Sequence, residues 1–217
     1  MIPTVNADFV YHMEDVLDLY AEPQDPKRPR VCFDECSYQL ISETRAVIPA
    51  APGRAERHDY EYKREGTCNL FLFACPERGW RHVKVTQRRT ILDVAHCLKE
   101  LVDVHFPEAE VIRLVMDNLN THTLAVLYEV FDPSEARRIA RKLEVHYTPK
   151  HGSWLDMAEI ELAVLHGQCL DRRLGDIGTV RAEVAAWEQR RNEMKASIDW
   201  HFTNDAARGT LERLYPA

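Results

Sequence analysis

The stretch EVIRLVMDN (110–118) decides the fold, because it is a short apolar run that ends on a carboxylate. The run from Val111 to Met116 is interrupted only by Arg113, which is typical of a strand buried inside a parallel or mixed sheet. Asp117 follows at the end of this run, and open α/β sheets bind ligands at the carboxyl ends of their strands. The stretch therefore predicts a central strand that carries a functional acid at its end.

Two other stretches contain acids in comparable settings. In RVCFDECSYQL (30–40), Asp34 interrupts an otherwise apolar run, and a carboxylate buried there is costly unless it is paired or coordinates a metal. In HGSWLDMAEIELAVL (151–165), Glu159 lies near the start of an expected helix. Three acids from separate elements make a site for hard divalent cations, which prefer oxygen ligands. Two such ions can flank a phosphodiester, so the pattern predicts a metal-dependent nuclease or strand-transferase.

Each of these acids also has a structural explanation when it is taken alone. Asp117 could cap the helix that is expected shortly after it, and Glu159 could complement the positive end of its own helix. Asp156 shares a helical face with Glu159 and could reach the same metal site, whereas Glu161 is rotated about 200° from Glu159. Only the three acids together favour a metal centre.

The order of the expected elements predicts an α/β fold. Apolar spacing predicts an opening helix over 6–20, and the prolines of 22–30 predict a connector that is neither helix nor central strand. Strand-like stretches follow, then a helix, the strand of 110–118, further helices, a short strand and closing helices. This order matches a ribonuclease H-like layout. The expected strands are 30–40, 44–50, a hairpin over 67–89 with its turn at Glu77–Gly79, 110–118 and 144–149.

The charge of the chain is unevenly distributed. The 217 residues carry 28 Lys or Arg and 35 Asp or Glu, a net charge of −7 that does not favour DNA binding, because phosphate contacts by basic side chains supply most non-specific affinity. Residues 41–90, however, contain ten basic and six acidic residues. A basic patch beside an acidic catalytic centre is compatible with work on DNA, and the alternative is a solvated surface of mixed charge.

Targeting signals and cysteine chemistry are not indicated by the sequence. It has no run of about 18 apolar residues and no charged start followed by an apolar block, so we expect no membrane association and a cytoplasmic location. The six cysteines are scattered, and the one close pair, Cys32 and Cys36, has no second pair to complete a zinc set. Buried free thiols are therefore expected.

Several blocks, in a consistent order, resemble the DDE superfamily endonuclease domain of bacterial insertion-sequence transposases related to the Tc/mariner group. The resemblance extends from about Phe9 to Pro216. The first-acid block is FDE (33–35), the blocks around the other acids are DNLNTH (117–122), YTPKHGSWL (147–155) and AEIEL (158–162), and two strand blocks are GTCNLFLF (66–73) and GWRHVKVT (79–86).

This resemblance implies a five-stranded ribonuclease H-like catalytic domain over 30–217, preceded by the helix and proline-rich connector of 1–29. It implies two Mg²⁺ or Mn²⁺ ions, with Asp34 and Asp117 bridging or flanking them and Glu159 completing the triad. The ions would activate water to cut at a transposon end and then activate the freed 3′-hydroxyl to attack target DNA. The implied partners are transposon ends and target DNA, and the implied assembly is a homodimer.

Three accessory positions lie in or beside these blocks. Asn118 and His122 are part of the resembling motif, and His122 could orient a carboxylate, touch DNA or make a structural hydrogen bond. Asp156 is a departure, because the family usually has Asn at this position. The added negative charge beside Glu159 is expected to weaken the approach of DNA or to alter metal occupancy.

Candidate phosphate contacts are basic residues of the segment 41–90 and of the stretch before the third acid, and each could instead be an ordinary surface charge. They are Arg54, Arg57, Lys63, Arg64, Arg88, Arg89 and Lys150. Complete members of the family carry helix-turn-helix domains ahead of the catalytic domain, whereas this chain starts almost at the connector. Recognition of specific transposon ends is therefore not expected of it.

The sequence leaves three functions open. The favoured one is the catalytic portion of a transposase, which cleaves and transfers DNA strands. The alternative is an inactive, truncated remnant that only binds DNA or another subunit, which Asp156 and the lack of recognition domains favour. The third is a ribonuclease H-type nuclease acting on RNA–DNA hybrids, against which the ordered blocks argue.

Overall fold

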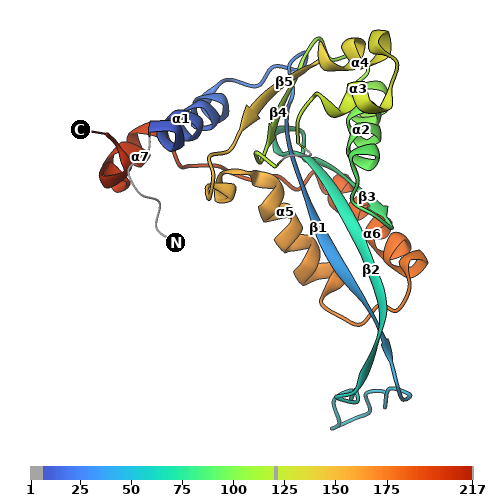
Figure 1. Cartoon of the computed structure of the whole chain (residues 1–217). Helices are drawn as coiled ribbons and strands as arrows, with labels where there is room; N and C mark the ends of the chain where they lie inside the picture. The colour runs from blue at the N-terminus through green and yellow to red at the C-terminus, as the bar shows by residue number, and fades with distance from the viewer. Residues whose placement is uncertain (1–6, 120–121, 217) are drawn as a thin grey trace.

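A mixed sheet of five strands organises the molecule in the computed structural model, which describes residues 7–119 and 122–216 (Figure 1). The order across the sheet is β3-β2-β1-β4-β5. Strand β2 is antiparallel to both of its neighbours, β1 and β3, whereas β4 and β5 run parallel to β1. The strand bounds are β1 Arg30–Glu43, β2 Tyr62–Cys75, β3 Trp80–Thr86, β4 Ile112–Met116 and β5 Leu143–Tyr147. The expected mixed five-stranded α/β sheet is confirmed.

Helices cover both faces of this sheet. One face carries α2, α3 and α4, and the other carries α5 and α6, while α1 and α7 lie together beside β5 (Figure 1). The helix bounds are α1 Ala7–Ala21, α2 Ile91–Glu100, α3 Val126–Val130, α4 Pro133–Ala140, α5 Met157–Leu165, α6 Ile177–Glu193 and α7 Asn204–Thr210. Across the described ranges 7–119 and 122–216, no helix is long and apolar enough to cross a membrane.

Two hydrophobic cores follow from the alternation of side chains along the strands. Successive residues of a strand point to opposite faces, so β1 directs Cys32 toward the α5 face and Phe33 toward the α2 face. The Phe33 ring stacks on those of Phe71 and Phe73 from β2, at centroid distances of 6.2 and 4.5 Å. Because both faces are covered, β4 is buried along its whole length, as its apolar sequence predicts.

The expected strand over 44–50 is wrong. Within these residues the structure has only an isolated bridge, between Ile48 and Arg57, in an exposed loop that projects from the end of the β1–β2 hairpin (Figure 1). Pro49 interrupts this segment, and proline cannot donate a ladder hydrogen bond. Strand β2 begins instead at Tyr62, ahead of the hairpin expected over 67–89, because residues 62–66 pair with the long carboxyl end of β1.

The hairpin turn between β2 and β3 lies where the sequence predicted it. A 3-10 turn over Pro76–Arg78 ends at Gly79, which has a φ of 59°. An added Cβ at Gly79 would lie 2.5 Å from the backbone of Lys195, so both conformation and space require glycine here. The turn thereby fixes the segment after α6 against the edge of the sheet.

Candidate metal centre

The parallel register of β1 and β4 brings two of the predicted acids to the same level of the sheet. Cys32 pairs with Val115, and Asp34 and Asp117 each follow this pair by two residues on neighbouring strands. Asp34 lies within β1, whereas Asp117 lies just beyond the end of β4. The expectation of one acid within a strand and one at the end of an adjacent strand therefore holds in the fold.

Asp34 faces the helix that carries the third predicted acid. By alternation it shares the face of Cys32, over which α5 packs, and Glu159 lies in the first turn of α5. Burial raises the pKa of Asp34 to about 7, against a 2.8 Å hydrogen bond from the Glu35 N–H, and the charges of Asp117 and Glu159 add to the rise. The three acids thus interact electrostatically across three separate elements.

His122 links Asp117 to a fourth acid. Its Nδ1 is bonded to the Asp117 carboxylate, its Nε2 lies 2.6 Å from Oε2 of Glu35, and its side chain is buried. Burial alone would lower the pKa of His122, but these two carboxylates raise it to about 9. Burial would raise the pKa of Asp117, yet the bond from His122 holds it below its usual value. His122 therefore orients a carboxylate, one of the three roles that the sequence left open.

Glu35 is a residue of the site that sequence reasoning missed. It is buried, holds His122, and accepts a 3.1 Å hydrogen bond from Arg89. Because neighbours on a strand point to opposite faces, Glu35 lies on the α2 face while Asp34 lies on the α5 face. A second acid directly after Asp34, in a strand buried on both faces, was the signal that could have identified it.

Asp156 caps α5 instead of facing outward. One carboxylate oxygen accepts a 2.8 Å hydrogen bond from the N–H of Ala158, and the side chain is 1% exposed. The other oxygen, Oδ2, is buried and has no hydrogen-bond partner among the described residues. Burial raises the pKa of Asp156 well above its ordinary value, against the Ala158 bond, and the charges of Asp34 and Glu159 add to the rise.

The residues at this site fit a divalent cation in charge and donor type. The charges of Asp117, just beyond β4, and Glu159 of α5 raise the proton affinity of Asp34 and Asp156, and Oδ2 of Asp156 is buried without a hydrogen-bond partner among the described residues. A cation among them would relieve this repulsion. In the described part of the chain, no three of these acids place one oxygen each within 4.8 Å of one another, so three of them could coordinate one ion only after moving closer together.

Glu161 is excluded from this site, as its rotation on the helix predicted. It is 1% exposed and forms ion pairs of 3.3 Å with Arg81 and 3.0 Å with Arg191. This buried network fastens α5 to β3 and α6. Glu161 is therefore a structural acid, whereas the charge of Glu159, on the same helix, acts on Asp34.

The remaining predicted residues fall into two groups. Asn118 and Lys150 are exposed in the connections after β4 and β5, and Arg88 and Arg89 are exposed between β3 and α2. Of these, Arg89 contacts Glu35 and contributes positive charge at Asp117. The second group is distant in the fold, on the β1–β2 hairpin and its projecting loop (Figure 1); its exposed members are Arg54, Arg57, Lys63 and Arg64.

The sequence of this chain matches a known protein family. A family model described as DDE superfamily endonuclease matches residues 29–181, most of the chain and all three predicted acids. No protein of curated function matches the chain by sequence. The family match agrees with the resemblance drawn from the sequence blocks.

Solved structures of the Mos1 mariner transposase share the fold. Its paired-end complex with Mn superimposes with a TM-score of 0.59 at 14% identity, covering 89% of this chain and 59% of that one. Its strand transfer complex gives a TM-score of 0.60 at 14% identity, covering 87% and 55%. The likeness confirms the ribonuclease H-like fold, and this chain spans less than two thirds of the length of the Mos1 chains.

Proposed function

Because this chain belongs to the DDE superfamily of endonucleases, we propose that it is the catalytic domain of a DNA transposase of the bacterial insertion-sequence type. Its reactions would be metal-dependent cleavage of phosphodiesters at transposon ends and transfer of the cut strands to target DNA. The observation that carries the proposal, beside the family match, is the placement of Asp34 within β1, Asp117 just beyond the end of the neighbouring β4, and Glu159 in the first turn of α5, which packs on β1.

The residues proposed to hold the metal are Asp34, Asp117 and Glu159, and the proposed cofactor is a pair of Mg²⁺ or Mn²⁺ ions. Ions bound there would supply an activated attacking oxygen and stabilise the leaving oxygen. The buried, carboxylate-rich setting supports this choice, since hard cations prefer oxygen ligands.

The neighbours of the triad position its ligands. His122 is held by Glu35 and bonds one oxygen of Asp117, so the other Asp117 oxygen stays available to a metal. Such a partner beyond the ligand fixes its orientation and is worth about 10–100-fold in affinity or activity at metal sites. Arg89 completes this chain of contacts by pairing with Glu35.

DNA is the proposed substrate. Arg88, Arg89 and Lys150 would contact phosphates near the reacting bond, and the basic hairpin residues Arg54, Arg57, Lys63 and Arg64 would contact DNA further away. Their exposure supports this assignment, because basic side chains reach phosphates from the surface. A homodimer, in which a second copy would act at the other transposon end, belongs to the same proposal.

Nicking of supercoiled plasmid DNA in the presence of Mn²⁺ tests the proposal. The native chain is expected to convert supercoiled plasmid into open circles, and Asp117→Asn to reduce this to background because it removes a metal ligand. The control is Asp132→Asn, the same change at an exposed acid before α4, which should nick like the native chain.

Two other results would each support a different function. A folded chain that binds DNA but nicks no faster than Asp117→Asn would support the inactive remnant. Faster cleavage of RNA–DNA hybrids than of duplex DNA would support a ribonuclease H-type nuclease. An oligonucleotide with a free 3′-hydroxyl, offered together with plasmid, tests strand transfer separately from cleavage.

A further inference from the structure

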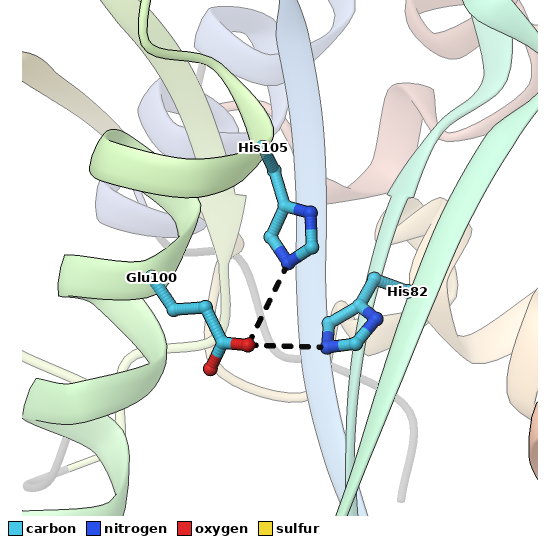
Figure 2. A group of neighbouring side chains, drawn as sticks. All are labelled: His82, Glu100 and His105. Carbon is cyan, nitrogen blue, oxygen red and sulfur yellow. Dashed lines mark ion pairs between the residues drawn. The ribbon is translucent and has the colours of Figure 1, made fainter.

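Three potential metal ligands gather at another place in the molecule, between β3 and the end of α2. Figure 2 shows Glu100 directed toward the imidazoles of His82 and His105. Its Oε1 lies 3.9 Å from Nε2 of His82 and 4.0 Å from Nε2 of His105, and one ligand atom from each residue falls within 4.8 Å of the others. In the described ranges of the chain, no other group of His, Cys, Asp and Glu meets this condition.

A change of helical pitch brings two of these residues together. Glu100 ends α2, and a π-helical turn over Leu101–His105 continues it. Residues five apart would point about 140° away from each other in a regular α-helix, whereas the wider turn brings them toward one face. Spacing in a regular helix would keep Glu100 and His105 apart, so their juxtaposition could not have been foreseen from the sequence.

His82 is oriented as metal-bound histidines are. Its Nδ1 lies 3.1 Å from Oε1 of Glu188 on α6, and the other oxygen of Glu188 accepts a 2.8 Å hydrogen bond from the Val83 N–H. A carboxylate that accepts the proton of one ring nitrogen directs the lone pair of the other nitrogen toward the ligand site. Nε2 of His82 is thereby aimed at Glu100 and His105.

The two imidazoles leave their inner nitrogens without hydrogen bonds. Nε2 of His82 and Nε2 of His105 are both buried and have no hydrogen-bond partner within the described residues. Buried polar atoms in proteins are nearly always partnered, so these two atoms require an explanation. A bound cation would satisfy both of them at once.

Lys84 provides the competing explanation for this cluster. Its Nζ lies 2.6 Å from Oε2 of Glu100, so the glutamate charge already has one partner. That contact uses one carboxylate oxygen and leaves Oε1 facing the two imidazoles. An ion pair alone therefore accounts for Glu100 but does not account for the two histidine nitrogens.

We propose that His82, Glu100 and His105 form a second metal site for a borderline divalent cation of the Zn²⁺ type. Two imidazoles and one carboxylate suit zinc, whereas Mg²⁺ and Mn²⁺ select carboxylates, carbonyls and water. The ion would tie β3 to the end of α2. Such a site is independent of the acids on β1, β4 and α5.

Zn²⁺ calorimetry on the whole chain carrying Asp117→Asn tests the proposal, since that substitution removes a ligand of the other centre. We expect one saturable Zn²⁺ site that His105→Gln abolishes. His96→Gln is the matched control, because His96 is exposed on the same α2 and lies outside the cluster. Glu188→Gln, which removes only the orienting charge, should weaken binding about 10–100-fold.

Co²⁺ provides a second readout that does not depend on affinity. Bound at low coordination number by two imidazoles, it should give intense visible absorption bands, which His105→Gln removes and His96→Gln keeps. Melting curves without metal establish that each variant is folded, and Glu100→Gln replaces His105→Gln if that variant is not. Absence of a Zn²⁺ site in the folded chain, or an unchanged site in both ligand variants, would overturn the proposal.

Discussion

Asp34 is about half protonated near pH 7 because burial raises its pKa to about 7, with the charges of Glu35, Asp117 and Glu159 contributing. An unfolded aspartate has a pKa of about 3.9, so between these values the folded chain binds more protons than the unfolded chain. The free energy of unfolding should therefore fall as the pH rises through this range. Metal bound at the site replaces the proton and should oppose the fall.

Asp34→Asn tests this linkage, because an amide cannot ionise. Without metal, we expect the substitution to raise the free energy of unfolding by about 2 kcal/mol more at pH 8 than at pH 5. Denaturant titrations at several pH values measure the difference. Asp132→Asn keeps Asp34, so the difference between its free energy of unfolding and that of the native chain should not change with pH. Parallel curves for Asp34→Asn and the native chain would contradict the assigned pKa.

Some of the candidate site residues could be predicted from the sequence, and others could not. Asp34, Asp117 and Glu159 were predictable as candidate site residues because each stands out against apolar or helical surroundings and lies in an ordered motif. Glu35 was not, since its role depends on the strand face that meets His122. The grouping of His82 with Glu100 depends on packing of β3 against α2, for which local sequence carries no signal.

At the scale of elements, the first turn of α5 sets the position of Glu159. Asp156 caps this helix through the N–H of Ala158. We expect Asp156→Ala to lower the free energy of unfolding by about 1 kcal/mol, whereas Asp156→Asn keeps the cap, removes an acid and should cost nothing. Urea unfolding distinguishes the two, and equal losses for both variants would show that the charge itself matters.

The boundaries of helices and strands were predictable from the sequence where the conformational preferences of single residues determine them. The β2–β3 turn was predictable because its proline restricts the backbone and its glycine can adopt the positive φ at which the turn ends. The failed strand at 44–50 and the unforeseen one at 62–66 have one cause: β1 extends to Glu43 and pairs with whichever segment returns alongside it. Strand pairing is a long-range contact, so residue preferences alone could not decide between the two segments.

For the whole molecule, helix α1 is joined to the rest of the fold through the α5-side core. Met13, Val16 and Leu17 are buried in that core, and Arg30 donates hydrogen bonds to the carbonyls of Leu19 and Tyr20. The boundary predicted at residue 29 thus separates segments that pack together. The amphipathic pattern predicted the helix, but nothing in it indicated where the helix would dock.

The metal centre is the central claim at this scale, because it requires strands, helix and connections to assemble together. Anomalous diffraction from crystals grown with Mn²⁺ and a short DNA duplex measures it directly. We expect Mn²⁺ bounded by Asp34, Asp117 and Glu159, and its loss in Asp117→Asn crystals. Mn²⁺ bound only away from these acids, or retained there in the variant, would contradict the claim.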